Sequence, residues 1–251
     1  MPEKWLDLLH RRVSELDGDA FYRPPDEQDR DLLQFVWVMS AYVPNSMGHA
    51  GEAVIAAAAA DAVMARSQLM TRLAQQASDL TDGPVSRKHQ HWAVAAHPIR
   101  TPSPLELRDP KLASVRQRTS LNPVEVGAFT STPGPAGNSM WEIYLHLLPR
   151  GLAPTHVWTL ELLDDPVLEI DSAIEWVRLA DRYGREVDGM IRPDWSEVAE
   201  DYAGVHLAAR AVAAIQGFSF ETAAGLTAPA FWDVEQTLWF RWAFRSVAGL
   251  T

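Results

Sequence analysis

The spacing of apolar residues divides this chain into a helical first third and a more varied remainder. Apolar positions recur every three to four residues over 5–16 and again from about 50 to 80, which predicts helices with one apolar face. Residues 32–43 are apolar nearly all round, which predicts a buried helix. The turn-forming run Asp82-Gly83-Pro84 ends the last of these segments. We therefore expect helices to dominate up to about residue 84.

Beyond residue 84, short β-like runs separated by Pro and Gly alternate with short helical patterns. The predicted strands are His91–Ala96, Val124–Ser131, Val157–Leu162, Val167–Ile170, Val205–Leu207 and Thr237–Phe244. The predicted helices are Ser139–Leu147, Ser172–Tyr183, Trp195–Tyr202 and Ala208–Gln216. Strands mixed irregularly with helices are typical of an α+β fold. The pattern predicts a helical N-terminal region, 1–84, followed by an α+β domain, 85–251.

Composition narrows the class of protein. With 251 residues and 47% hydrophobic content, the chain is long enough to bury a sizeable core. It has no cysteine, so disulfides, thiolate nucleophiles and cysteine-bound metals are excluded, and a reducing cytoplasm is expected. Residues 1–4 run directly into an amphipathic segment, and the longest apolar runs are too short to cross a bilayer. We expect a soluble cytoplasmic protein without a signal peptide or a membrane partner.

The charge of the chain is unevenly distributed. The net charge of −11 argues against a nucleic-acid footprint over the whole protein. The window 85–118 nevertheless holds 7 basic and 2 acidic side chains. One interpretation is that this basic window binds the phosphates of a dinucleotide or of a nucleic acid. The other is that it is a solvated connector that balances an acidic remainder.

Two short segments contain candidate catalytic groups. Asp233 and Glu235 precede an aromatic, alternating run, and an acid at such a strand entry is expected to be partly buried with its charge still usable. The alternative is that both acids face solvent. The triplet Thr130-Ser131-Thr132 ends a predicted strand. Its hydroxyl groups can orient a nearby carboxylate, or they can cap the turn that follows.

Taken in this order, with basic residues upstream, these motifs resemble those of the mono-ADP-ribosyltransferases over about residues 90–251. That family has an Arg on its first strand, a hydroxyl triplet on its second and a Glu that leads into a later strand. The matching positions are Arg100, Thr130-Ser131-Thr132 and Glu235. The resemblance implies a split β-sheet domain that uses NAD as its substrate and needs no metal. It also implies transfer of ADP-ribose to an acceptor.

The resemblance assigns roles to three residues. Arg100 would hold the pyrophosphate or a ribose, and Ser131 would orient Glu235. Glu235 would bind the ribose 2′-hydroxyl and stabilise the cationic sugar that forms when nicotinamide leaves. Arg100 is preferred because it follows the best strand candidate. Other arginines of the basic window that remain open for this role are Arg108, Arg116 and Arg118.

Further residues are expected at an NAD site. Thr130 and Thr132 flank Ser131, and Trp141 is a candidate shelf for the nicotinamide ring, although it can equally be an apolar anchor of its helix. Many family members have Glu or Gln two residues before the catalytic Glu, where it helps to select the acceptor. This chain has Asp233 there, so the acceptor, a protein or a nucleic acid, is not predicted.

Histidines offer weaker alternatives. His89, His91 and His97 are close in sequence, but their spacing matches no closed metal-ligand pattern, so no metal is expected. His206 lies in a short apolar run and is expected to be a core histidine or to support a site residue.

Two other functions stay open. In the first, the protein is a non-enzymatic interaction module whose Trp-rich C-terminus and helical region 1–84 bind a partner. In the second, it is a catalytically inactive member of the same fold. The sequence is compatible with a toxin, a defence effector or a housekeeping modifier.

Overall fold

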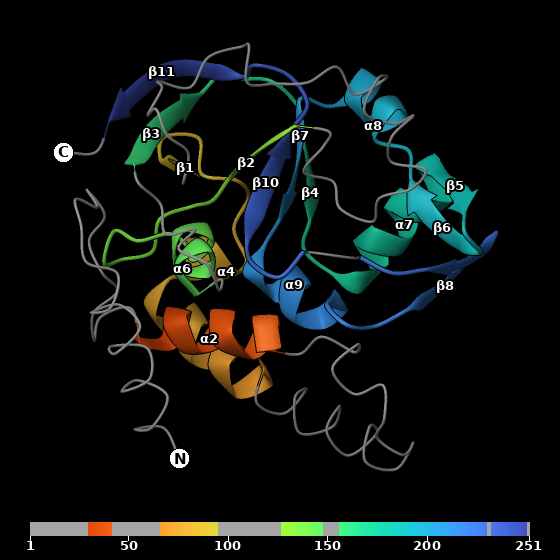
Figure 1. Ribbon diagram of the computed structural model, residues 1–251, viewed down its shortest axis with the longest axis horizontal. Coiled ribbons are helices and arrows are strands. Elements are labelled where there is room, and N and C mark those ends of the chain that lie inside the picture. Colours follow the sequence, from red (N-terminus) through yellow and green to blue (C-terminus); the bar gives the residue numbers. More distant parts are fainter. Residues whose placement is uncertain (1–29, 42–65, 95–126, 148–155, 230–231, 250–251) are drawn as a thin grey trace.

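A computed structural model describes residues 30–41, 66–94, 127–147, 156–229 and 232–249 (Figure 1). The helices are α2 (Arg30–Ala41), α4 (Ser78–Thr81), α6 (Met140–Leu147), α7 (Ala173–Tyr183), α8 (Trp195–Asp201) and α9 (Ala209–Ile215), and residues 66–76 are also helical. The first seven strands are β1 (Gln90–Val94), β2 (Ala128–Thr130), β3 (His156–Leu162), β4 (Val167–Ile170), β5 (Gly184–Val187), β6 (Met190–Pro193) and β7 (Gly204–Leu207). The remaining strands are β8 (Phe220–Thr222), β9 (Gly225–Thr227), β10 (Gln236–Trp239) and β11 (Phe244–Gly249). The fold is mixed α+β, as the sequence predicted.

The strands form three sheets. β2, β10, β7 and β4 lie side by side in that order, with β10 antiparallel to both neighbours and β4 parallel to β7. β1, β3 and β11 form an antiparallel sheet, and β5, β6, β9 and β8 form the third. A single antiparallel bridge between His91 and Ser131 joins the edge of the first sheet to the edge of the second. The strand order therefore brings β1, β2 and β10 next to one another.

The register of the first sheet places the polar residues of interest. Thr237 of β10 pairs with Thr130 of β2 on one side and with His206 of β7 on the other. His206 in turn pairs with Glu169 of β4. Because β10 is antiparallel to β2 and β7, its first residues lie beside the last residues of those strands. Glu235, which immediately precedes β10, therefore lies next to Ser131 and His206.

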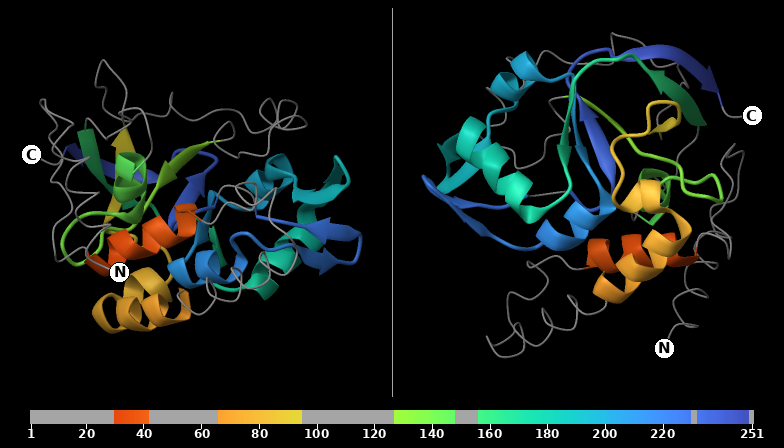
Figure 2. Two further views of the ribbon diagram at one scale, coloured as in Figure 1. Left: turned by 60° about the horizontal axis from the view of Figure 1, so that its bottom comes forward. Right: turned by 180° about the vertical axis from the view of Figure 1, so that it is seen from behind.

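One large hydrophobic core joins the N-terminal helices to the sheet. Leu32 and Phe35 of α2 and Leu69 of the helical stretch 66–76 are buried in the same cluster as Val205 and Leu238 of the sheet. Figures 1 and 2 show α2 beside residues 66–76 at one end of the molecule, away from β5 and β6. The described part of the N-terminal region shares a core with the α+β region, and a domain boundary at residue 84 stays a prediction.

Two predicted elements differ from the structure. The run 237–244 was predicted to be one strand, but β10 ends at Trp239 and β11 begins at Phe244 in a different sheet. No Gly or Pro marks this break, so the alternating pattern passes through it. The helix predicted to about residue 80 stops being regular at Ala77, whose backbone is not helical (φ −149, ψ 67). The helix predicted at 5–16 lies outside the described residues.

Within the described ranges, no helix is both long and apolar enough to cross a membrane.

Candidate active site

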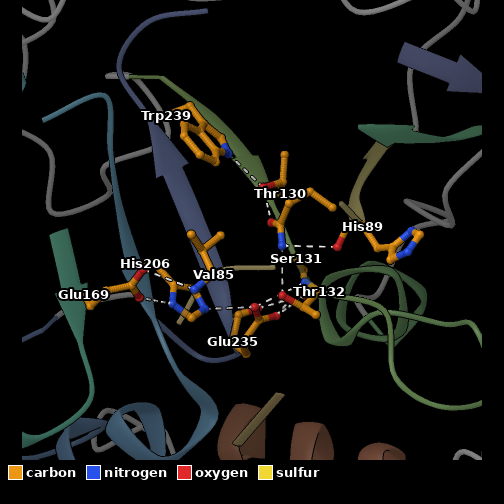
Figure 3. Close-up of polar contacts among 10 residues, drawn as sticks. Val85, His89, Thr130, Ser131, Thr132, Glu169, His206, Glu235 and Trp239 are labelled. Atoms are coloured by element: carbon orange, nitrogen blue, oxygen red, sulfur yellow. Dashed lines mark hydrogen bonds and ion pairs between the residues drawn. The ribbon is translucent and has the colours of Figure 1, made fainter. Parts of the chain in front are cut away.

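Glu235 is the centre of a buried hydrogen-bond network (Figure 3). The Ser131 hydroxyl donates to Glu235 Oε2 at 2.5 Å, and the Thr132 backbone N–H lies 3.0 Å from Oε2 and 3.2 Å from Oε1. The His206 Nε2 atom lies 3.1 Å from Oε1. The structure thus brings together Ser131 and Glu235, the pair that the sequence singled out. Donors on two sides hold this carboxylate in one orientation.

The burial of Glu235 is more complete than predicted. Its exposed fraction is 0%, as is that of Ser131, whereas the sequence predicted partial burial. The physical reason is the position of the residue between the ends of β2 and β7, both of which contribute groups that cover the carboxylate. Glu235 does not face solvent, so the alternative of a solvated acid is excluded.

His206 connects Glu235 to a second carboxylate. Its Nδ1 atom lies 2.6 Å from Glu169 Oε2, and the other oxygen of Glu169 accepts the Val85 backbone N–H at 3.1 Å. Burial of His206 opposes its protonation, but the hydrogen bonds and negative charges of Glu169 and Glu235 outweigh burial and raise the pKa of His206 to about 9. The imidazole is therefore positively charged at neutral pH and bridges two carboxylates.

The two threonines of the triplet are held by Gln90. The Thr130 hydroxyl donates to Gln90 Oε1 at 2.6 Å, and Gln90 Nε2 donates to the Thr132 hydroxyl at 2.8 Å. The Trp239 indole N–H donates to the Thr130 hydroxyl at 2.8 Å. Because these hydroxyls are bound inside the protein, Ser131 is the triplet residue whose side chain contacts Glu235. The triplet therefore orients the Glu235 carboxylate through Ser131, and Gln90 and Trp239 hold the threonines of the triplet in place.

Trp141 and Asp233 lie together in a neighbouring cluster. The Trp141 ring stacks on Phe129 and on Tyr144, with ring centroids 5.5 Å apart in both pairs. The Tyr144 hydroxyl donates to Asp233 Oδ2 at 3.1 Å, and Gln216 donates to Asp233 Oδ1. Burial raises the pKa of Asp233, although the hydrogen bonds from Tyr144 and Gln216 oppose this effect. Asp233 thus forms hydrogen bonds to α6 and to the residue that ends α9. These partners differ from those of Glu235.

A cavity of about 750 Å³ lies next to this network. Its lining residues are Gln76–Leu80, Gly83–Ser86, His89 and Thr132–Pro135. Thr132 lines the cavity and also donates its backbone N–H to Glu235. On the other side, Val85 lines the cavity and donates its N–H to Glu169. The cavity therefore reaches one backbone donor of each carboxylate, although neither Glu235 nor Glu169 lines it. Its volume is within the usual range for small-molecule sites.

The predicted phosphate ligand is not among these residues. Arg100 lies outside the described residues, as do the other three arginines considered for the role. β1, the strand beside the triplet, has the sequence Gln-His-Trp-Ala-Val and contains no arginine. The position of β1 that contacts the triplet through its side chain is Gln90.

His89, His91 and His97 are the metal-ligand candidates that the sequence offers, and their spacing predicts no metal there. His91 Nδ1 is 2.7 Å from Glu142 Oε1, and the Ser139 hydroxyl donates to the same oxygen at 2.6 Å. His97 lies outside the described residues. In the part of the chain that the structure describes, no group of three or more His, Asp or Glu side chains is placed to hold a metal ion.

The sequence patterns indicate Ser131 and Glu235 as site residues but do not indicate Glu169 or Gln90. The prediction for His206 allowed a supporting role, and its contact with Glu235 fits that interpretation. Glu169 is a single acid in the otherwise apolar strand β4, Val-Leu-Glu-Ile, and nothing in that local pattern marks it as a site residue. Gln90 had no distinguishing signal either. Only the pairing of β4 with β7, and of β1 with β2, brings these residues to the site.

In comparisons with protein-family models, curated proteins and solved structures, nothing matched this chain.

Proposed function

We propose that this protein is an ADP-ribosyltransferase-like enzyme, with a split β-sheet catalytic domain, that cleaves NAD at the bond between nicotinamide and ribose. The observation that supports the proposal best is the contact between the Ser131 hydroxyl and the Glu235 carboxylate at 2.5 Å. The two residues are 104 positions apart in the chain and were selected from the sequence by the same family pattern. The three strands that the pattern involves, β1, β2 and β10, are neighbours.

In the proposed reaction, the bond between the ribose C1′ atom and the nicotinamide nitrogen breaks. Neutral nicotinamide leaves with the electron pair of that bond. The sugar develops oxocarbenium character, which a fixed carboxylate stabilises. Glu235 accepts a hydrogen bond from the ribose 2′-hydroxyl, and its carboxylate faces the positive charge that develops on the sugar. An acceptor nucleophile then bonds to C1′ and loses its proton to solvent, which leaves ADP-ribose on the acceptor. When water takes the place of the acceptor, the product is free ADP-ribose.

The cavity beside Thr132 is the site that we propose for NAD. Thr132 separates it from Glu235, and the segment Gly83–Ser86 forms another part of its wall. Since Glu235 is fully enclosed, turnover requires these wall residues to move and expose the carboxylate. Arg100 remains our candidate for the pyrophosphate, and the acceptor, a protein or a nucleic acid, is left open.

The same enclosure favours a second candidate function. If the wall never opens, the protein is an inactive member of the fold in which the Ser131–Glu235 pair only stabilises the sheet. The proposed partner of such a protein would bind elsewhere, for example at the helical N-terminal region. The two candidates differ in whether nicotinamide is released.

The test measures nicotinamide release by the full chain with NAD, in the wild type, Glu235→Gln and Ser131→Ala. The matched control is Glu161→Gln, since Glu161 is a half-exposed glutamate of β3 that contacts Arg245. Loss of a preorganised group lowers kcat by about 10²–10³-fold, so we expect that loss in Glu235→Gln and wild-type turnover in the control. Circular dichroism checks that each variant is folded.

Either of two results would overturn the proposal. One is a wild type that releases no nicotinamide. The other is a folded Glu235→Gln variant with unchanged turnover. A thermal shift with NAD separates the remaining functions, because a protein that binds NAD gains about 2.7 kcal/mol at a concentration one hundred times Kd, whereas a module that does not bind it gains nothing.

A further inference from the structure

We infer that Glu169 and His206 are positioning residues for Glu235. The charged row Glu169–His206–Glu235 holds the Glu235 carboxylate in the orientation that it needs to contact the sugar. This inference rests on the proposed function, because it names how that site is held in its working geometry. Neither residue contacts Ser131 in the hydrogen bonds described above, so their effect on the reaction passes through Glu235.

The row follows from strand pairing. β7 lies between β4 and β10, and each neighbour brings one carboxylate to His206: Glu169 from β4 and Glu235 from the entry to β10. His206 has an exposed fraction of 1%. All four residues of β7 are buried, so the strand and its imidazole have little freedom to move. The ring is fixed before any ligand binds.

The hydrogen bonds define the charge of the ring. Both nitrogens lie within hydrogen-bond distance of a carboxylate oxygen, at 2.6 Å and 3.1 Å. A carboxylate accepts, so each nitrogen must donate, and a neutral imidazole can donate from only one. With both carboxyl groups ionised, this geometry selects the imidazolium form, and the raised pKa of His206 agrees with it. Its positive charge offsets the cost of enclosing Glu235.

The two oxygens of the Glu235 carboxylate have different donors. His206 contacts Oε1, Ser131 contacts Oε2, and the Thr132 N–H spans both. Without His206, Oε1 keeps only the 3.2 Å contact with the Thr132 N–H, and the carboxylate is free to rotate further about its last torsion. A misplacement of about 1 Å costs on the order of 10²-fold in rate. His206 thus contributes orientation that Ser131 alone does not supply.

Glu169 links this row to the cavity. Its second oxygen accepts the N–H of Val85, which lies in the cavity wall, and its side chain is 36% exposed. Glu169 is therefore the accessible end of the row, and Glu235 is its enclosed end.

The test uses the full chain and two matched amides at one position. The side-chain amide of His206→Gln reaches the place of Nε2 and can still donate to Glu235. The amide of His206→Asn reaches only the place of Nδ1 and can donate to Glu169 but not to Glu235. We expect kcat for nicotinamide release to fall on the order of 10²-fold in His206→Asn, with KM nearly unchanged, and to be largely retained in His206→Gln.

The pH profile gives a readout that a purely structural role would not change. Above about pH 9 the ring of His206 keeps one N–H, which the closer contact with Glu169 (2.6 Å against 3.1 Å) holds on Nδ1, so Nε2 stops donating to Glu235. In the wild type, kcat should therefore fall as the pH rises through about 9. This alkaline limb should be absent in His206→Gln, since an amide does not titrate in that range. In Glu169→Gln the limb should move to lower pH, because the imidazolium loses a neighbouring negative charge. Glu169 is partly exposed, so we expect this variant to fold.

The outcomes separate the two proposals. The inference is overturned if folded His206→Asn keeps the wild-type kcat, or if the alkaline limb persists in His206→Gln. Neither result affects the proposed function, which Glu235→Gln tests separately. If the wild type releases no nicotinamide at any pH, the proposed function fails, and the positioning role in that reaction fails with it.

Discussion

The buried imidazolium predicts that this protein loses stability as the pH rises from about 6.5 to 9. The pKa of His206 is raised from 6.5 to about 9 in the folded state. In that window the folded state holds one proton that the unfolded state has released, so the free energy of unfolding falls with rising pH. The stabilisation is complete below about pH 6.5 and is lost above about 9. One pH unit corresponds to about 1.4 kcal/mol, so the total loss is about 3 kcal/mol.

Urea unfolding at a series of pH values, followed by the fluorescence of the 10 tryptophans, measures this loss. The control is His206→Gln, which keeps a donor but cannot titrate, so its free energy of unfolding should be nearly flat over the same window. Measurements stay below pH 9.5, because the raised pKa values of Tyr144 and Tyr183 affect stability only at higher pH. A wild type without the slope, or a variant that shows the same slope, would refute the reasoning.

Two further predictions concern the strands that hold the site. Gly127→Ala should lower the free energy of unfolding by about 3 kcal/mol or more, because its Cβ would lie 1.8 Å from the Trp239 carbonyl oxygen; a wild-type urea midpoint would contradict this packing. Trp239→Phe removes the indole donor to Thr130 and should cost about 1–3 kcal/mol. The double variant with Thr130→Val should lose less than the two single variants together, and strict additivity would mean that the two groups do not interact.

Much of the secondary structure was predictable from local pattern. β3, β4 and β7 match the predicted strands 157–162, 167–170 and 205–207 within about one residue, because strand patterns are local signals. The hairpin of β5 and β6 was not predicted, although its turn has the sequence Asp188-Gly189 with positive φ at both residues. That pair is a recognised hairpin signal, so this hairpin is encoded locally in the sequence.

The site was predictable only in part. The hydroxyl triplet and Glu235 stand out because each sits beside a strand-like run, and Ser131 does contact Glu235. The distance between them, the full enclosure of the carboxylate and the bracing by Gln90 depend on which strands are neighbours. Strand order is set by long-range pairing, which a single sequence does not display.

By itself, therefore, the sequence determined the α+β class, most strand positions and the two residues most suited to carboxylate chemistry. The tertiary structure decided what surrounds that carboxylate. Glu169 and His206 are 66 and 29 residues from Glu235 along the chain, yet the pairing of β4, β7 and β10 places them in one charged row. Hydrophobic and turn patterns encode local geometry, whereas the protonation of His206 and the enclosure of Glu235 arise only when distant strands exclude water between them.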